Sequence, residues 1–382
     1  MTTTKKNNNL KILQIIPNLR KGGAERLILD IVNELSNRKD VEVKLVVFSK
    51  ENAYLSNSDN IEVTQVNTST SLSIYKKNKL EIDELQKIIK DFQPDIIHSH
   101  LFMSEIVSRS CYYPNAKWFS HCHDNMIQFE NFELNTLTNK AKLTNFYEKK
   151  YLFNRYKING GTHFIAISND TKTYFENTAQ PFPVTLLHNA INFDKFYCEK
   201  KLDVSGETLK LINVGSLVEK KNQKFLINVV ENIIAKGHKV SLQLLGDGKN
   251  RNLLEDIVKD KKLSEYVFLR GNVDDVEKYL WNSDIYVHSA LYEPLGLVLM
   301  EAMAAGLPVV TTDGKGNRDL IKQGENGYML DNFDAETFAN KIIEVWSDKN
   351  KYQKMSAFAQ HFAKDYDIKN YVDKLLKIYN GE

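Results

Sequence analysis

Two carboxylates in an otherwise apolar stretch are the residues of this chain that best suggest chemistry. The run from Tyr292 to Val310 reads YEPLGLVLMEAMAAGLPVV and places Glu293 and Glu301 eight positions apart. A carboxylate buried in such a run needs a partner, because an unpaired charge in apolar surroundings is costly. Two acceptors beside a bound phosphate can hold hydroxyl groups on either side of it. A nucleoside diphosphate sugar has this layout, with ribose hydroxyls on one flank and sugar hydroxyls on the other.

The same run predicts how these carboxylates are positioned. Pro near the start and Gly just past the end predict a short buried helix over residues 295–305. Glu293 would lie just outside its N-terminus, and Glu301 about two turns inside. A helix N-terminus offers unpaired N–H groups and the positive end of the dipole, and Gly296 would let a phosphate come close. This favours a phosphate site over an ordinary buried helix with one capping glutamate.

The run resembles the E-x7-E signature of retaining glycosyltransferases of family GT4, which have the GT-B fold. The resemblance implies that Glu293 contacts the donor sugar and that Glu301 binds the nucleotide ribose. Gly296 and its neighbours Leu295 and Leu297 would stabilise the leaving diphosphate. The resemblance also implies an acceptor that is a cell-surface polysaccharide or its lipid-linked precursor.

Composition sets the broad class. The chain has 382 residues, 42% of them hydrophobic and 26% charged, and a net charge of +2. This length suits two domains, and the charge balance gives no sign of a nucleic-acid partner. Three cysteines without a C-x-x-C motif suggest free thiols in a reducing compartment. The polar start, MTTTKKNNN, and the lack of a long apolar run lead us to expect a cytoplasmic protein, at most peripheral to the membrane.

The first half opens as a strand–loop–helix unit. Residues 10–17 (LKILQIIP) predict a strand buried on both faces, residues 24–36 a helix, and residues 41–48 the next strand. Gly22 and Gly23 fall in the loop at the carboxyl end of the sheet, where ligands bind in open α/β folds. A tight turn that needs glycine is the alternative. In GT4 relatives the backbone of this loop approaches the donor phosphate or the acceptor.

The second half repeats this pattern without repeating the sequence. A strand over residues 209–214 leads into the loop GSLVEKKN, which contains Lys221. An ammonium group there can neutralise a diphosphate, although a solvated charge pair is the simpler alternative. The family usually carries an Arg directly after the Gly of this loop. Here Ser216 replaces that Arg, while Lys221 keeps the position of the family's Lys.

A third loop of the second half completes the expected donor site. Gly271 ends a predicted strand over residues 267–271, and Asn272 and Val273 follow it. In relatives the backbone just after this Gly borders the nucleobase.

These patterns predict an α/β protein with the GT-B architecture, two doubly wound Rossmann-like lobes with a cleft between them. We expect residues 1–200 to form the acceptor-binding domain and residues 201–365 the nucleotide-sugar-binding domain. Residues 366–382 would form a terminal helix that packs back on the first domain, as is common in GT-B proteins.

Four histidines lie near two predicted strand ends: His98 and His100 in PDIIHSH, and His121 and His123 in KWFSHCH. Such spacing could supply zinc ligands. We expect each pair to point to opposite faces of its strand, which leaves one histidine per strand end for function and argues against a metal. Many GT4 members have a histidine here that contacts the donor sugar. His123 matches it best, with His121 as the competing register and a structural surface histidine as the alternative.

The segment over residues 132–158 is basic and aromatic. A basic amphipathic helix can lie on an anionic membrane surface, whereas a solvated face over a core stripe is the commoner explanation. Peripheral membrane contact through this segment agrees with relatives that glycosylate lipid-linked acceptors.

The sequence thus predicts a retaining glycosyltransferase of the hexosyltransferase type that uses a nucleotide-sugar donor and needs no metal or cofactor, because N–H groups and Lys221 supply the positive field. A nucleotide-sugar epimerase on the same fold would need no acceptor. A non-enzymatic sugar-binding protein is the other alternative, and the buried Glu301 argues against it.

Overall fold

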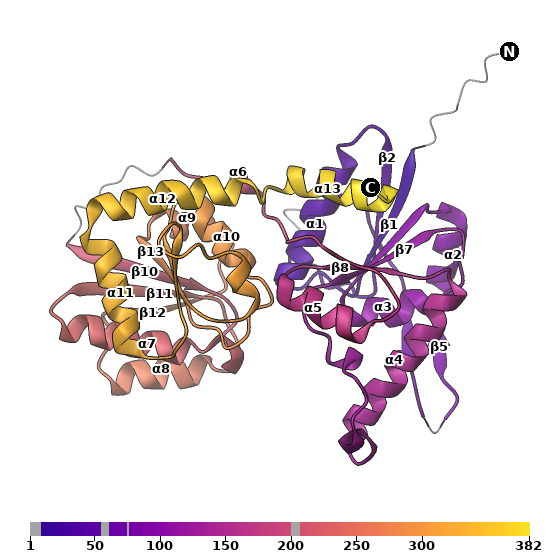
Figure 1. Ribbon diagram of the computed structural model, residues 1–382, viewed down its shortest axis with the longest axis horizontal. Coiled ribbons are helices and arrows are strands. Elements are labelled where there is room, and N and C mark those ends of the chain that lie inside the picture. The colour runs from indigo at the N-terminus through magenta and orange to yellow at the C-terminus, as the bar shows by residue number, and fades with distance from the viewer. Residues whose placement is uncertain (1–8, 55–60, 75, 200–206) are drawn as a thin grey trace. The chain divides into compact units, whose positions relative to one another are not determined.

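The computed structural model of the chain describes residues 9–54, 61–74, 76–199 and 207–382 (Figure 1). Contacts between residues divide it into two compact units. Unit 1 comprises the described residues up to Asn189 together with Ile368–Glu382, and unit 2 comprises Ala190–Asp367. The domain boundary expected between residues 200 and 201 lies outside the described residues. The chain enters unit 2 once and returns, so its last helix belongs to unit 1.

Unit 1 contains a seven-stranded parallel sheet with the order β3-β2-β1-β6-β7-β8-β9. The strands are β1 (Leu10–Ile16), β2 (Val41–Val47), β3 (Val63–Gln65), β6 (Ile96–His100), β7 (Lys117–Cys122), β8 (His163–Ala166) and β9 (Val184–Leu186). β4 (Ser69–Ser71) and β5 (Lys79–Glu81) form a separate antiparallel pair. The apolar β1 is buried along most of its length, as expected for a parallel strand covered on both faces.

Helices cover both faces of this sheet. They are α1 (Gly23–Ser36), α2 (Asp83–Phe92), α3 (Leu101–Ser110), α4 (Lys140–Ile158), α5 (Asn169–Thr178) and α13 (Ile368–Asn380), with short 3-10 turns at Ile127–Phe129 and Leu134–Leu137. Alternation along β1 explains the two layers: Leu13 and Ile15 pack in the core that includes α2 and α3, whereas Ile16 packs in the core that includes α1. α13 lies beside α1 (Figure 1).

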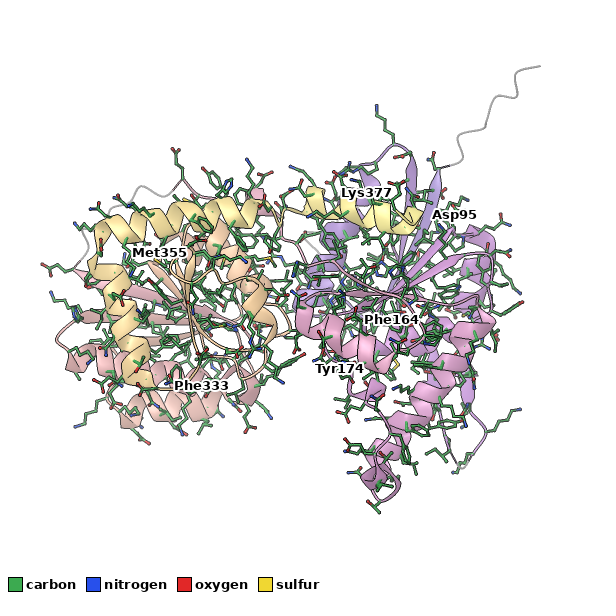
Figure 2. All side chains as sticks on the ribbon, in the orientation of Figure 1. Asp95, Phe164, Tyr174, Phe333, Met355 and Lys377 are labelled. Carbon is green, nitrogen blue, oxygen red and sulfur yellow. The ribbon has the colours of Figure 1, made fainter. Side chains whose placement is uncertain are left out.

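A third core in unit 1 lies beneath α4 and α5. Phe164 of β8, labelled in Figure 2, is buried there. Its ring packs against those of Phe129 and Phe175. These aromatic contacts pack β8 against α5 and against the 3-10 turn at Ile127–Phe129, which follows β7 and His123 in the chain.

Unit 2 contains a six-stranded parallel sheet with the order β12-β11-β10-β13-β14-β15. The strands are β10 (Thr208–Val214), β11 (Lys239–Leu245), β12 (Val267–Gly271), β13 (Ile285–His288), β14 (Val309–Thr312) and β15 (Gly327–Leu330). The helices are α6 (Phe193–Phe196), α7 (Gln223–Ala235), α8 (Arg251–Asp260), α9 (Val276–Trp281), α10 (Leu297–Ala304), α11 (Ala335–Ser347) and α12 (Lys349–Lys364).

The core of unit 2 joins this sheet to its helices. Leu211, Leu242 and Ile285 of the sheet, Val230 of α7 and Phe338 of α11 are fully buried members of it. Each unit is therefore an α/β layer structure with its own core, which confirms the expected fold class.

Candidate functional site

The strand order of unit 2 changes direction between β10 and β13, the two strands in the middle of its sheet. Ligands bind at such a point in open α/β sheets. Two hydrogen bonds join the loops that follow these strands: Ser289 Oγ donates to the backbone oxygen of Lys221 at 2.9 Å, and Leu291 N donates to that of Lys220 at 2.8 Å. Lys221 is thereby held beside the segment that carries Glu293.

Glu293 lies at the centre of a buried charged cluster. Its Oε2 is 2.5 Å from Lys221 Nζ and 3.1 Å from His288 Nε2, and only 7% of the residue is exposed. Burial raises the pKa of Glu293, but Lys221 and His288 together outweigh burial and lower it to about 2. Glu293 is therefore a carboxylate at neutral pH. It can hold a ligand hydroxyl by accepting its hydrogen bond, and it is unsuited to act as a general acid.

His288 is a member of this cluster that sequence reasoning missed. It is the last residue of β13, and it reads as part of the apolar strand IYVH. Burial lowers the pKa of His288, an effect that the neighbouring Glu293 opposes, so the ring is neutral at neutral pH. Among the described residues, its Nδ1 has no hydrogen-bond partner, and its Nε2 lies 3.1 Å from Glu293 Oε2 without the geometry of a hydrogen bond. Its position at the carboxyl end of a central strand was the available signal.

Helix α10 begins at Leu297, two residues later than the predicted start at residue 295. Gly296 precedes it with φ of +97°, a left-handed conformation that favours glycine, and no side chain caps the helix there. A Cβ at Gly296 would lie 2.7 Å from Leu299 Cδ1 and 3.2 Å from Glu293 Cγ. The later start places Glu301 just over one turn inside the helix, instead of two.

Glu301 is buried in α10, with 4% of the residue exposed. Burial raises the pKa of the Tyr286 phenol, and the charges of Glu293 and Glu301 raise it further. Both acids of the E-x7-E run thus act on the same buried side chain of β13. The structure therefore brings together Lys221, Glu293, Gly296 and Glu301, along with Leu295 and Leu297.

A glycine loop that follows β14 is hydrogen-bonded to the backbone of Glu293. Glu293 N donates to Gly314 O at 2.8 Å, and Gly316 N donates to Glu293 O at 3.0 Å. A Cβ at Gly316 would lie 1.8 Å from Pro294 O, so only glycine allows this approach. The loop DGKGNR was visible in the sequence, but its role beside Glu293 was not.

The remaining predicted donor residues of unit 2 lie in loops at the same edge of the sheet. Ser216 is exposed in the loop after β10. Gly271 ends β12, where its backbone oxygen accepts a hydrogen bond from Gly246 N at 2.7 Å, and Asn272 and Val273 follow. These residues lie at the carboxyl ends of β10 and β12, which β11 separates.

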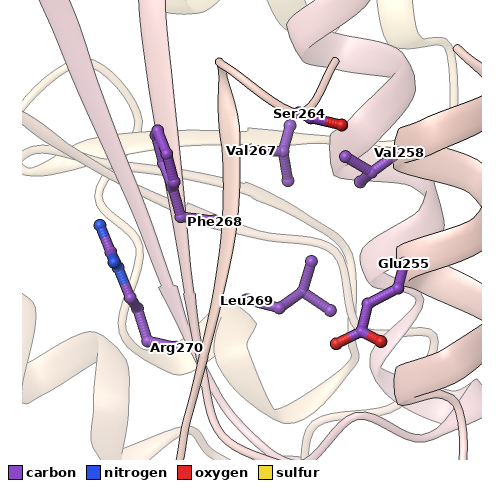
Figure 3. Close-up of a pocket in the computed structure, with 7 residues that line it drawn as sticks. All are labelled: Glu255, Val258, Ser264, Val267, Phe268, Leu269 and Arg270. Carbon is purple, nitrogen blue, oxygen red and sulfur yellow. The ribbon is translucent and has the colours of Figure 1, made fainter. Parts of the chain in front are cut away.

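A shallow groove of about 330 Å³ lies elsewhere in unit 2, between α8 and the edge strand β12 (Figure 3). Leu269 and Val258 line it, and Arg270 stacks on the Phe268 ring at 4.9 Å. It contains none of the predicted site residues.

In unit 1, Gly22 and Gly23 lie where β1 passes into α1. Gly22 is the N-cap of α1, and its N–H donates to the hydroxyl of Tyr54 at 3.0 Å. A Cβ at Gly22 would collide with the Glu25 carboxylate, and burial raises the pKa of Glu25. The glycine pair thus forms a loop whose backbone is already partly engaged by a tyrosine.

The four histidines of unit 1 gather in one place, and the expectation that each pair would split is wrong. Residues i and i+2 of a strand share a face; it is successive residues that alternate. Ring centroids are 4.4 Å apart for His98 and His100 and 4.4 Å apart for His121 and His123. Because β6 and β7 are parallel neighbours, with His100 opposite His121, the two pairs also stack on each other.

These histidines are neutral at neutral pH. Burial lowers the pKa of His98, His100 and His123 well below the usual range, and it lowers that of His121 to about 4. His123 is the most exposed of the four at 9%, whereas the others are 0–1% exposed. His121 lies deeper and places its Nε2 3.3 Å from Asn189 Oδ1. The geometry therefore makes His123 the better candidate to reach a ligand.

Ring orientation does not favour a metal in this cluster. One nitrogen from each of His98, His100 and His121 lies within 4.8 Å of the others. The His121 ring, however, is stacked at 19° on both other rings, so these edges run parallel instead of converging on one point. Both nitrogens of His100 are also already hydrogen-bonded, to His123 and Gln14. The donor set therefore fits a hydrogen-bonded network better than a tetrahedral zinc site.

Two protein-family models match nearly the whole chain. Residues 21–195 match the model described as Glycosyltransferase Family 4, and residues 197–362 match Glycosyl transferases group 1. The chain belongs to the family 4 glycosyltransferases. This confirms the predicted family.

Similar proteins agree with this family. The lipopolysaccharide core biosynthesis glycosyltransferase LpsE of Rhizobium meliloti is 37% identical over 150 residues, which are 39% of this chain and 43% of LpsE. The poly(ribitol-phosphate) alpha-N-acetylglucosaminyltransferase of Staphylococcus aureus is 27% identical over 300 residues, 78% of this chain and 57% of that protein. The chain therefore spans about half the length of these curated relatives.

A solved structure supports the fold. HepE of Anabaena, determined with UDP and with UDP-glucose, superposes with a TM-score of 0.77 at 19% identity, covering 98% of this chain and 100% of HepE. This family 4 glycosyltransferase therefore has the GT-B fold, with two α/β lobes.

Proposed function

We propose that this glycosyltransferase moves a sugar from a nucleoside diphosphate sugar to a hydroxyl group of a glycan or a lipid-linked glycan precursor, with retention at the anomeric carbon. The observation that carries the proposal is the ionised Glu293, held by Lys221 and His288 four residues before the uncapped N-terminus of α10. The names of LpsE and of the poly(ribitol-phosphate) enzyme support a role in cell-surface polysaccharide synthesis.

The donor binds mainly to unit 2 in this proposal. Backbone N–H groups around Gly296, from Leu295 to Leu297, together with Lys221, stabilise the departing diphosphate, so no metal ion or other cofactor is required. Glu301 binds the ribose, and Gly271 to Val273 border the base. Glu293 holds a hydroxyl of the transferred sugar without forming a covalent bond to it.

Unit 1 contributes the remaining groups. His123 contacts the transferred sugar, and the Gly22–Gly23 loop approaches the donor phosphate or the acceptor. The acceptor hydroxyl then attacks from the side of the leaving diphosphate. His123 is favoured among these groups because it is the least buried member of the neutral histidine cluster, with 9% of the residue exposed.

A donor screen tests the proposal. The protein would be incubated with a panel of UDP-, GDP- and ADP-sugars, and thermal shift and release of nucleoside diphosphate would be measured. We expect one nucleotide class to stabilise the protein and to be slowly hydrolysed, with release accelerated by a glycan acceptor. Conversion of the donor sugar to an epimer without acceptor would instead identify an epimerase, and an absence of binding to every nucleotide would refute the proposal.

A peripheral membrane contact near the start of α4 would bring lipid-linked acceptors to the enzyme on the cytoplasmic face. Figure 1 shows this end of α4 projecting away from the sheet of unit 1. Leu134 is 87% exposed, and Ile127 and Phe132 are 58% and 47% exposed, close in sequence to the exposed Lys140. This combination suits an anionic membrane surface. Among the described residues, no helix is long and apolar enough to span a membrane.

The proposed contact uses only the first part of the basic segment expected over residues 132–158, because two basic residues further along bind backbone oxygens of the protein. Lys149 donates to the Phe129 backbone oxygen at 2.8 Å, and Arg155 donates to the carbonyls at the end of α3, so neither serves a surface. Co-sedimentation with phosphatidylglycerol vesicles should therefore weaken for Leu134→Glu. The control Ile158→Glu, at the exposed opposite end of α4, should bind like the wild type. Equal binding by both variants would exclude this contact.

A further inference from the structure

A fully buried glutamine of β1 links the C-terminal helix to the histidine cluster. Gln14 is 0% exposed, and both ends of its amide are used. Its Nε2 donates to the Tyr379 hydroxyl at 3.1 Å, and its Oε1 lies 2.9 Å from His100 Nε2. His100 Nδ1 in turn lies 3.0 Å from His123 Nε2. A continuous chain of hydrogen bonds therefore runs from α13 to His123, entirely within unit 1.

The amide gives this chain a direction. An amide oxygen can only accept, so His100 Nε2 must carry the proton that it donates to Gln14. A neutral imidazole has only one N–H, which leaves His100 Nδ1 as an acceptor. His123 Nε2–H must then be the donor to it, and His123 Nδ1 carries no proton. The orientation of the Gln14 amide thus determines the tautomer of His123, through the hydrogen bonds of His100.

Tyr379 holds the amide in this orientation. Its hydroxyl accepts from Gln14 and lies 2.6 Å from His98 Nδ1, to which it can donate its own proton. The Tyr379 ring also packs on Phe119 with centroids 4.8 Å apart, and Lys117 Nζ donates to the Tyr379 backbone oxygen at 3.1 Å. Both partners of the hydroxyl are buried, so water does not compete for these bonds.

We propose that Tyr379 and Gln14 are positioning residues that keep His123 in its Nε2–H tautomer, so that its Nδ1 acts only as an acceptor and selects a ligand hydroxyl that donates to it. The ligand class is a sugar hydroxyl. This inference rests on the proposed function for the identity of that ligand, whereas the tautomer itself is a property of the ligand-free protein. The terminal helix thereby gains a role in setting the chemistry of a residue at the far end of the network.

The tautomer can be measured directly. Protein labelled with ¹⁵N at histidine would be recorded by long-range ¹H–¹⁵N correlation at neutral pH without ligand, with His123→Gln providing the assignment. We expect His123 Nε2 to show the shift of a protonated nitrogen and Nδ1 that of a bare nitrogen. A protonated Nδ1 on His123 would overturn the proposal, because it requires the reversed amide. Stoichiometric zinc in the purified protein would also overturn it.

Variants test the positioning role. Tyr379→Phe removes only the hydroxyl and should give a mixture of His123 tautomers, with kcat lowered several-fold and the donor KM little changed. Gln14→Met removes the link and should act in the same way. Lys117→Met is the matched control, since it loosens the same turn of α13 without touching the hydroxyl, and it should leave the tautomer and kcat unchanged.

The outcomes separate the two proposals. An unchanged tautomer and unchanged kcat in both Tyr379→Phe and Gln14→Met would refute the positioning role. If no donor is turned over by any form of the protein, the proposed function fails, while the ¹⁵N spectra still decide the tautomer. Thermal melts of each variant show whether a change in spectrum reflects only loss of folding.

Discussion

The two buried polar clusters of this protein differ in charge: the cluster in unit 2 is ionised and the cluster in unit 1 is neutral. In unit 2, Glu293 stays charged because Lys221 and His288 compensate for its burial. In unit 1, four histidines are buried, no carboxylate of the described residues raises their pKa, and they are neutral instead. The charged cluster suits a ligand that carries charge, such as a diphosphate. The neutral cluster suits the recognition of hydroxyl groups, where the direction of each hydrogen bond decides what fits.

Acid should affect the two units differently, and we expect this to be the largest effect. A histidine with a lowered pKa binds a proton in the unfolded chain before it does so in the folded one, so stability is lost as pH falls from about 6.5 towards the folded value. For His121, whose pKa is about 4, this amounts to roughly 3 kcal/mol. Glu293 acts in a lower window: its stabilisation is present above its ordinary pKa of 4.5 and is lost as pH falls from there towards about 2.

Hydrogen exchange followed by mass spectrometry between pH 7 and pH 4.5 measures this difference, after correction for the intrinsic rate at each pH. Peptides of β6 and β7 should lose protection first, while those of β10 and β13 change less, since His288 is the single buried histidine at that site. Loss of protection in unit 2 before unit 1 would contradict the contrast between the clusters.

Removing the charge from Glu293 should have the next largest effect. Glu293→Gln keeps the shape but weakens a charge-assisted hydrogen bond, so kcat should fall by about 10- to 100-fold. The KM for the donor should change much less, because the proposed function assigns the diphosphate to Lys221 and the backbone around Gly296. Steady-state rates with the donor found in the screen measure this. Wild-type turnover in the variant would contradict the proposed role of Glu293.

Gly296→Ala tests the backbone at the start of α10. Strain at its φ of +97° and the close approach to Leu299 should lower the unfolding free energy by roughly 1–3 kcal/mol. Gly161→Ala is the matched control, because its φ is +112° but a Cβ there meets nothing within 4 Å. The difference between the two, taken from urea denaturation, isolates the cost of packing. A larger loss for Gly161→Ala would contradict the tight approach at Gly296.

Glu301→Ala should have the smallest effect and should act on binding. Loss of a carboxylate acceptor for the ribose should weaken nucleotide binding by about tenfold, while turnover at saturating donor changes little. Calorimetry and steady-state kinetics on the same preparation separate the two parameters. A loss in kcat at unchanged affinity would contradict the assignment of Glu301 to nucleotide binding and would give it the role assigned to Glu293.

The predicted elements were correct where a local pattern decides them. The strand over residues 10–17 and the helix over residues 24–36 appear in the structure, because apolar runs and periodicity fix such elements. The helix predicted from residue 295 begins at Leu297, since Gly296 takes a left-handed conformation that the run of letters does not show. Local patterns thus located the motif but not its first turn.

The partners of the site residues could not be predicted in the same way. Gln14 and Tyr379 are 365 positions apart, and nothing local marks them as neighbours. His288 was hidden within an apolar strand, although its position at the strand end was a usable signal. The error on the histidine pairs was one of geometry, because residues two apart in a strand share a face. Predicting contacts between distant segments requires knowledge of the sheet topology.

Nucleotide calorimetry in the absence of metal tests the central claim most directly. UDP, GDP and ADP would each be titrated into the protein in EDTA and again with excess Mg²⁺ or Mn²⁺. If backbone N–H groups at α10 and Lys221 supply the positive field, one nucleoside diphosphate will bind with a Kd that is unchanged within about twofold between the two conditions. Binding that is lost in EDTA and restored by the divalent ion would contradict this account.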